Sequence, residues 1–345
     1  MKTAVLTGKR EIQIREKQVE EPGDKDVLVK VNGVGLCGSD LHFYTDGRIG
    51  SAVIKGERIL GHEVCGRIER TGRSVTNLKT GDLVVLDPSR GCQQCEDCRS
   101  GRENLCRDGS RRFLGNAYSD GAMQEYVVSP ASHTFKINEG CPVERAVLTE
   151  PLSVALHAVN QAQVSYGDCA VVLGVGCIGL MVITALKEKG VSRIIAIDLE
   201  KERLHMAAEF GAETVICPQE TDPIETVLKV TGGDGAELVI ETAGSTITQA
   251  QTISYVKRGG QIILVGMAPG KPVQMDLDSL IRKEGTLKTV FRFRSEFMQA
   301  VRIMNAKEPP LEDMVTVYQG WEQLQQAFEE ASSGKKGMIK AVIKL

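Results

Sequence analysis

The chain has 345 residues, of which 42% are hydrophobic and 25% are charged, and its formal net charge at pH 7 is −3. A single core rarely grows beyond about 250 to 300 residues, so this length predicts two domains. The balanced charge offers no basic surface for nucleic acid or an anionic membrane. No apolar stretch approaches the roughly 18 residues of a membrane-spanning helix, and no signal-peptide pattern follows Met1. We therefore expect a cytoplasmic protein that acts on a small molecule.

The first 150 residues predict short strands separated by glycines and long loops. The strands expected there cover residues 3–6, 11–15, 27–31, 65–70 and 83–86. From about Pro151 apolar strands alternate with glycine turns and amphipathic helices. The strands expected in that part cover residues 170–173, 193–197, 214–216, 238–240, 261–265 and 287–290. This alternation predicts the α/β class, with a doubly wound parallel sheet that binds a dinucleotide.

Four residues of the first half have the chemistry of metal ligands. Cys37 lies in a Gly-Leu-Cys-Gly-Ser-Asp segment, His62 and Glu63 follow Gly61, and Glu150 ends this half of the chain. One thiolate, one imidazole and one or two carboxylates form the incomplete ligand set of a catalytic zinc, which leaves a position for water or an alcohol oxygen. Taken singly, such residues are more often buried packing residues or helix-start carboxylates.

Four further cysteines follow the spacing C-x2-C-x2-C-x7-C within a lobe of residues 91–107. They are Cys92, Cys95, Cys98 and Cys106. Two-residue gaps let a tight chain reversal direct successive sulfurs to one point, and four thiolates complete a closed tetrahedral zinc shell. Because such a shell has no open position for substrate, we expect a structural zinc that orders the lobe. An iron–sulfur cluster or simple reduced thiols explain the pattern less well.

A G-x-G-x-x-G motif follows the first strand of the second half. It contains Gly174, Gly176, Ile178 and Gly179. In this position the glycines allow a tight turn, close approach of the backbone to a pyrophosphate and close helix packing. Asp198 ends the next strand, where a carboxylate accepts hydrogen bonds from ribose hydroxyls and repels a 2′-phosphate, so NAD is favoured over NADP. Arg203 is placed to stack on adenine or to meet a phosphate.

Together these pieces resemble the zinc-dependent medium-chain alcohol dehydrogenase family. The segment Gly61-His62-Glu63-x-x-Gly66, with a further glycine at Gly72, is similar to the zinc signature of that family, and the other motifs occur in family order. Residues 150–157 and 290–293 resemble the polyol branch, the sorbitol and xylitol dehydrogenases. The resemblance implies a GroES-like catalytic domain at 1–152 and 291–345, a Rossmann NAD-binding domain at 153–290, and a homodimer or homotetramer.

The resemblance also implies roles for single residues. In the polyol branch the residues that match Cys37, His62 and Glu63 hold the catalytic zinc, and the match to Glu150 lies close by; which carboxylate binds directly stays open. The remaining matches concern proton transfer and the nicotinamide. Ser39 and His42 match the family's proton relay, although a surface histidine is a serious alternative for His42, and we expect Val265, Gly266 and Met267 along the nicotinamide.

The substrate prediction depends on an aromatic pair and on arginines. Phe43 and Phe293 stand where polyol dehydrogenases commonly have tyrosines, which weakens the case for plain sorbitol. Arg292 and its neighbour Arg294, like the pair at 111–112, carry guanidinium groups that suit phosphate recognition, so a pentitol or hexitol phosphate is the second hypothesis. Solvated arginines, or arginines on the cofactor phosphates, are the plainer explanation.

We therefore predict zinc-dependent oxidation of a secondary alcohol of a sugar alcohol to the ketose, with hydride transfer to NAD. A zinc-free quinone reductase would lack Cys37 and His62, and a primary-alcohol or threonine dehydrogenase would differ only in its pocket residues. A non-catalytic NAD-binding or structural protein with the same fold is the alternative from another class, and the intact ligand set argues against it.

Overall fold

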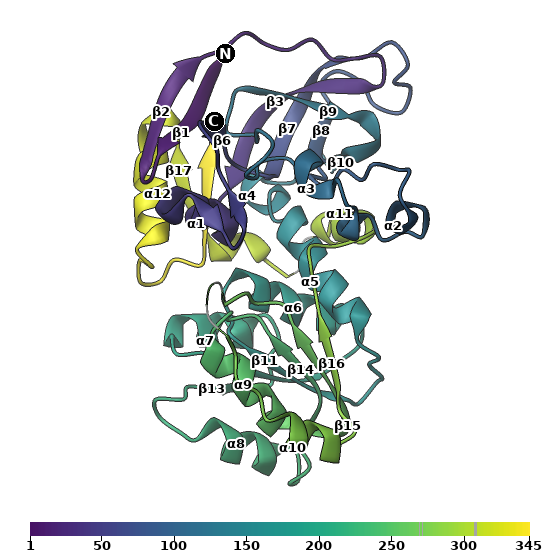
Figure 1. Cartoon of the computed structure of the whole chain (residues 1–345), viewed down its shortest axis with the longest axis vertical. Helices are drawn as coiled ribbons and strands as arrows, with labels where there is room; N and C mark the ends of the chain where they lie inside the picture. Colours follow the sequence, from purple (N-terminus) through teal and green to yellow (C-terminus); the bar gives the residue numbers. More distant parts are fainter. Residues whose placement is uncertain (269, 271, 307–308) are drawn as a thin grey trace. The chain divides into compact units, whose positions relative to one another are not determined.

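A computed structural model describes residues 1–268, 270, 272–306 and 309–345. The chain forms two compact units, one of residues 1–150 and 297–345 and the other of residues 151–296 (Figure 1). The boundaries thus fall a few residues away from the expected ones, and residues 151–152 and 291–296 group with the second unit. Among the described residues no helix combines the length and the apolarity needed to cross a membrane.

The first unit is built mainly of antiparallel strands. Its elements up to residue 150 are β1 (Lys2–Gly8), β2 (Glu11–Glu16), β3 (Asp26–Gly35), α1 (Gly38–Asp46), β4 (Arg48–Ile49), β5 (Ala52–Val53), β6 (Arg58–Ile59), β7 (Glu63–Thr71), β8 (Leu83–Leu86), α2 (Glu96–Arg99), η1 (Glu103–Leu105), α3 (Gly109–Arg112), β9 (Tyr126–Pro130), η2 (Ala131–His133), β10 (Thr134–Lys136) and α4 (Val143–Ala146). Those from residue 297 onwards are α11 (Phe297–Met304), η3 (Leu311–Met314), β17 (Val315–Gln319), η4 (Trp321–Gln323), α12 (Leu324–Ser332) and β18 (Lys340–Lys344).

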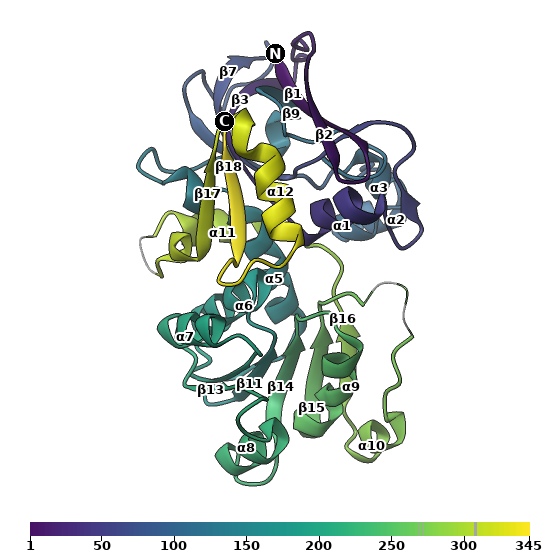
Figure 2. The same ribbon diagram turned by 90° about the vertical axis from the view of Figure 1, so that its left-hand side faces the viewer.

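The main sheet of this unit joins the two ends of the chain. Its strand order is β10-β8-β7-β3-β18-β17, with β9 also paired to β3. β18 runs antiparallel to β3, so the last strand lies next to an early one (Figure 2). Alternate residues of β3 and β7 enter one apolar core, which also includes Val84, Tyr44 and Phe328. Burial of such side chains, at about 25 cal/mol per Å² of apolar surface, is the main force that holds the sheet together.

The second unit is a parallel sheet with alternating helices. Its elements are β11 (Cys169–Leu173), α6 (Cys177–Glu188), β12 (Arg193–Ile197), α7 (Lys201–Glu209), β13 (Thr214–Ile216), α8 (Pro223–Val230), β14 (Ala236–Glu241), α9 (Thr246–Tyr255), β15 (Val256–Leu264), α10 (Leu277–Arg282) and β16 (Thr286–Thr289), while α5 (Thr149–Gln161) begins at the unit boundary. The strand order is β13-β12-β11-β14-β15-β16. Renumbered within the sheet this is 3-2-1-4-5-6, the order of a doubly wound dinucleotide domain, so the predicted fold class is confirmed.

Candidate metal and cofactor sites

Cys37, His62 and Glu63 come together in the first unit. Cys37 lies just after β3 and His62 just before β7, and the two strands pair antiparallel with Gly35 opposite Glu63. One ligand atom from each of the three residues lies within 4.8 Å of the others. The Nδ1 atom of His62 is buried and makes no hydrogen bond within the described part of the chain. A thiol, an imidazole and a carboxylate with an unused buried nitrogen fit a metal ion, and three ligands leave one position open.

Asp40 ties the two ligand segments to each other. Its carboxylate accepts hydrogen bonds from the backbone N–H of Cys37 at 3.0 Å and of Gly61 at 3.1 Å. Its Oδ1 atom also lies 3.8 Å from Nδ1 of His62. Burial raises the pKa of Asp40, and the nearby imidazole and the backbone donors only partly offset this effect. Asp40 is a site residue that the sequence reasoning missed, although it lies only three positions after Cys37.

Negative groups dominate the surroundings of His62. Burial favours the neutral ring, but Asp40 and then Cys37 and Glu150 outweigh it and raise the pKa of His62 to about 10. Glu150 is buried at the start of α5 and acts on His62 through its charge, but it does not belong to the group of three whose ligand atoms converge. The carboxylates and the thiol that surround His62 are groups whose negative charge a divalent cation would compensate.

The four cysteines of the lobe also converge. One sulfur atom from each of Cys92, Cys95, Cys98 and Cys106 lies within 4.8 Å of the others. Backbone N–H groups of Gln94 and Cys95 point at the sulfur of Cys92 and lower its pKa to about 6, and the backbone N–H of Cys98 lowers the pKa of Cys95. Burial raises the pKa of Cys98 to about 12. Four converging sulfurs, two of them tuned toward the thiolate, fit a closed structural zinc shell.

The residues proposed for proton transfer lie on α1. Ser39 is partly exposed in the first turn of this helix, and His42 lies one turn later with a side chain that is 44% exposed. The Nδ1 atom of His42 is 3.5 Å from the carboxylate of Asp46. The sequence did not predict α1, because its nine residues lack a clear amphipathic period.

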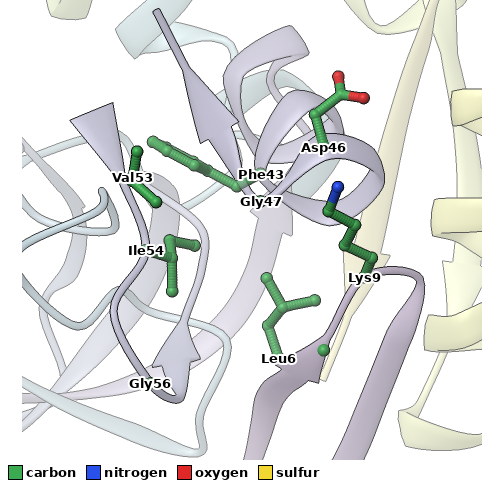
Figure 3. Close-up of a pocket in the computed structure, with 9 residues that line it drawn as sticks. Leu6, Lys9, Phe43, Asp46, Gly47, Val53, Ile54 and Gly56 are labelled. Carbon is green, nitrogen blue, oxygen red and sulfur yellow. The ribbon is translucent and has the colours of Figure 1, made fainter. Parts of the chain in front are cut away.

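Phe43, on the same helix, forms the wall of a small pocket. The pocket has a volume of about 240 Å³, and Leu6, Val53 and Ile54 also line it, with Lys9 and Asp46 adding charges of opposite sign (Figure 3). Neither Cys37 nor His62 lines this pocket. The ring of Phe43 is buried, so it contributes packing rather than a hydrogen-bonding group.

The glycine motif lies between β11 and α6 in the second unit. Gly174 has a φ of 83°, and a Cβ atom there would lie within 2.6 to 2.8 Å of Ala243. A Cβ on Gly179 would lie 2.0 Å from the carbonyl oxygen of Gly174, so this helix start also requires a glycine. Gly176 is the N-cap of α6 and leaves the first amides of the helix for a ligand.

Asp198, which directly follows β12, is bound to the glycine loop. Its Oδ2 atom accepts the backbone N–H of Val175 at 2.7 Å, and its Oδ1 atom accepts that of Glu200 at 2.9 Å. Its side chain is only 8% exposed, and Nη1 of Arg203 lies 3.9 Å away. The carboxylate therefore fixes the loop and still presents its negative charge beside it.

The remaining predicted residues of this unit follow two strands. Val265, Gly266 and Met267 come directly after β15, and the side chain of Met267 is exposed. A Cβ on Gly266 would lie 2.7 Å from Oε2 of the buried Glu241, which the sequence reasoning also missed. Arg292 has a φ of 55° and places its guanidinium 4.8 Å from the ring centre of Phe291. Phe293 is fully buried.

Comparison with known proteins identifies the family. Residues 23–139 match the alcohol dehydrogenase GroES-like domain, and residues 177–306 match the zinc-binding dehydrogenase domain. Sorbitol dehydrogenase of Bacillus subtilis (strain 168) is 34% identical over 99% of this chain and 97% of its own length. The chain belongs to the zinc-dependent medium-chain alcohol dehydrogenases. The family that the sequence predicted is therefore confirmed, and the protein is an oxidoreductase.

Other relatives and solved structures define the cofactor. D-xylulose reductase A of Aspergillus oryzae is 32% identical over 96% of this chain and 93% of its own. Galactitol-1-phosphate dehydrogenase of Escherichia coli is 27% identical over 100% of both chains, with a TM-score of 0.90. Two further structures are each 26% identical over 100% of this chain and 99% of their own, with a TM-score of 0.90. The one from Escherichia coli CFT073 holds NADH, and the one from Sinorhizobium meliloti 1021 holds NADP. Zinc and a nicotinamide dinucleotide are thus the cofactors of this enzyme.

Proposed function

We propose that this enzyme oxidises a secondary alcohol of a sugar alcohol to the ketose and transfers the hydride to NAD. The observation that carries the proposal is the buried group of Cys37, His62 and Glu63, which offers three ligands and one open position. Relatives named sorbitol dehydrogenase and D-xylulose reductase support a polyol as substrate. The carboxylate of Asp198 beside the glycine loop supports NAD over NADP.

Each residue then has a defined task. Bound zinc supplies a Lewis acid that lowers the pKa of a coordinated hydroxyl. Cys37, His62 and Glu63 hold the metal, and Asp40 fixes the two ligand segments through its hydrogen bonds to Cys37 and Gly61. Ser39 and His42 carry away the hydroxyl proton. In the lobe the four cysteines hold a second, structural zinc.

Glu150 and the residues at the ends of two strands of the second unit complete the proposed machinery. Glu150 is buried and adds negative charge near His62, and this charge favours the binding of a metal cation. The backbone at Val265, Gly266 and Met267 contacts the nicotinamide, and Arg203 stacks on the adenine. These assignments extend the family's residue roles to matching positions of this chain.

A polyol phosphate is the second candidate substrate. Arg292 lies in the segment that resembles the polyol branch, and its guanidinium is a donor of the kind that binds phosphate. Galactitol-1-phosphate dehydrogenase, which matches over the whole chain, supports this alternative. Arg111 and Arg112 are exposed at the end of α3, and this exposure agrees with solvated side chains rather than with phosphate ligands.

We also propose that the enzyme forms a homodimer or homotetramer. β16 is the last strand of its sheet, and Leu287 on this strand is 36% exposed. Leu277 and Ile281 of the neighbouring α10 are 54% and 70% exposed. An edge strand that has no further partner among the described residues, together with exposed apolar side chains, favours pairing with another chain. Sedimentation velocity of the purified protein measures the state directly, and a monomer would contradict the proposal.

The decisive experiment for the reaction measures NADH or NADPH formation by absorbance. Zinc-loaded enzyme is supplied with NAD or NADP and a panel of pentitols, hexitols and their phosphates, and the Cys37→Ala variant serves as the blank. We expect turnover of free polyols with NAD. Turnover confined to phosphates would favour the second candidate and give Arg292 a role, whereas no turnover by a protein that still binds NAD would contradict both.

A further inference from the structure

Glu63 has a second partner besides the metal-ligand group. The Nζ atom of Lys340 donates to Oε1 of Glu63 at 2.5 Å and lies 2.5 Å from Oε2 as well. The two side chains are only 4% and 1% exposed. Lysine and glutamate are rarely buried this deeply unless they are paired, because removal of their charges from water is costly. The ammonium of Lys340 thus neutralises the buried carboxylate of Glu63.

The strand register explains how residues 277 positions apart make this contact. Glu63 of β7 pairs with Gly35 of β3, and Gly35 pairs with Val342 of β18, so these three residues form one row across the sheet. Lys340 precedes Val342 by two positions, and its side chain therefore emerges on the same face. The carboxylate of Glu63 occupies the space left by the missing side chain of Gly35, where a Cβ atom would lie 2.0 Å from Oε2 of Glu63.

The same carboxylate is one of the three converging ligands. An oxygen of Glu63 lies within 4.8 Å of both the sulfur of Cys37 and a ring nitrogen of His62. If zinc is held by Cys37, His62 and Glu63, the carboxylate of Glu63 would interact with two cations at once, the metal and the ammonium of Lys340. Two positive charges so close to each other repel strongly in a buried site. Lys340 and zinc therefore compete for Glu63.

We propose that Lys340 is a positioning residue that shares Glu63 with the catalytic zinc and so sets how tightly the site holds the metal. This inference depends on the proposed zinc site at Cys37, His62 and Glu63. With zinc absent, Lys340 compensates the buried carboxylate; with zinc present, it weakens the bond between Glu63 and the metal. The consequence is a site that is stable when empty and that releases its metal more readily than its ligand set alone would.

The test compares wild type with Lys340→Met, which removes the charge but keeps much of the volume, and Lys340→Arg, which keeps the charge. Zinc affinity is measured by competition with a chromogenic chelator, and thermal unfolding is followed for metal-loaded and metal-stripped protein. We expect Lys340→Met to bind the weaker of its two zinc ions about tenfold more tightly than wild type. Loss of an ordinary outer-shell partner costs about 10- to 100-fold in affinity, and the sign is reversed here because the group removed is a cation. The thermal stability of Lys340→Met is expected to fall mainly in the metal-stripped form. Lys340→Arg keeps the positive charge, so its zinc affinity should stay close to that of wild type.

Zinc binding by Lys340→Met that is equal to or weaker than that of wild type would overturn the proposal. An equal loss of thermal stability with and without metal would also overturn it, because that is what a purely structural lysine predicts. If Lys340→Met does not fold, Lys340→Gln replaces the ammonium by a neutral donor and is judged by the same two measurements. The zinc content of wild type separates the two levels of inference. After equilibration with excess zinc, one zinc per chain, held by the cysteine lobe, would contradict the proposed catalytic site itself. Two zinc ions per chain with unchanged affinity in the variant would contradict only the role of Lys340.

Discussion

Asp198 combines a structural and a recognition role in one side chain. It accepts the backbone N–H groups of Val175 and Glu200, so it holds the glycine loop against the end of β12. The same charged group is the one proposed to bind the adenosine ribose and to repel a 2′-phosphate. A simple truncation would disturb both functions, and a useful variant must separate them.

We predict that Asp198→Asn shifts the preference from NAD toward NADP. The amide oxygen can still accept the N–H of Val175, while the hydrogen bond from Glu200 and the charge that repels a 2′-phosphate are both lost. A hydrogen bond to a charged group contributes about 1.5 to 3 kcal/mol, so the KM for NAD should rise by roughly tenfold or more. The KM for NADP should fall, and steady-state kinetics with both cofactors measure the two changes.

Asp198→Ala is the matched comparison, because it removes the acceptor for Val175 as well as the charge. We expect Asp198→Ala to bind both NAD and NADP more weakly than Asp198→Asn does, and to unfold at a lower temperature. If Asp198→Asn weakened the binding of NAD and of NADP equally, the carboxylate of Asp198 would serve only to hold the glycine loop.

The sequence predicts Asp198 and the metal ligands more readily than their partners. Gly179 lies in α6 and Asp198 directly follows β12, so both belong to one strand-helix-strand unit. Asp40, which supports Cys37, lies only three positions after it. Lys340 differs, because its partner Glu63 is 277 positions away and reaches it only through the register of three strands. No local pattern marks Lys340, which lies among other lysines of the C-terminal segment.

At the scale of elements, a buried ion pair joins α5 to the segment that follows β16. The Nδ1 atom of His157 lies 3.0 Å from Oε1 of Glu296, and the backbone N–H of Arg294 donates to Oε2 at 2.8 Å. Burial disfavours the charged carboxylate, but the hydrogen bond and charge of His157 and the Arg294 amide outweigh it and lower the pKa of Glu296 to about 2. No local sequence pattern predicts this pair, because its two members are far apart in the chain.

Stability from this pair should depend on pH in a defined window. Because the pKa of Glu296 is lower in the folded protein than its usual value of 4.5, its contribution is complete above about pH 4.5 and is lost as the pH falls toward 2. At pH 5.5 we expect Glu296→Gln to be less stable than wild type by about 2 kcal/mol, or roughly 4 to 8 °C. The difference should shrink as the pH approaches 2.5, as measured by calorimetry.

Glu209→Gln is the matched control. Glu209 also faces a histidine, His205, at 3.5 Å, but these side chains are 58% and 80% exposed. Exposed pairs contribute little to stability, so this variant should follow wild type at every pH. A difference between Glu296→Gln and wild type that stays constant down to pH 2.5 would show that packing, rather than charge, links the two elements.

At the scale of the whole molecule, local patterns predicted the second unit better than the first. The first five strands of the parallel sheet, β11 to β15, are each followed by a helix of the same unit. The alternation is therefore visible in consecutive residues, and the connection rules restrict the possible sheet orders. In the first unit, β17 and β18 return from the far end of the chain to pair beside β3. That return was available only from the family resemblance, because nothing in residues 315–344 specifies which strand they will pair with.

The first unit also contains both candidate metal sites, and the described residues of the second unit contain no such group. The two sites differ in kind. Cys37, His62 and Glu63 offer three ligands and an open position, whereas the lobe offers four cysteines, of which Cys98 and Cys106 are buried. A closed four-thiolate shell exchanges its metal less readily than an open site and contributes to folding.

We therefore predict that a chelator such as dipicolinate removes two zinc ions per chain in two phases. The fast phase should abolish turnover and leave most of the thermal stability, while the slow phase should expose residues 91–107 to protease. Cys98→Ser should lack the slow phase and begin with one zinc per chain, whereas Cys141→Ser, whose cysteine lies outside both groups, should behave as wild type. NAD binding by calorimetry should survive both phases, because the glycine loop and Asp198 belong to the other unit. Loss of both zinc ions in one phase, with turnover and protease resistance declining together, would mean that the two sites fold as one structure rather than as a catalytic centre and a separate structural lobe.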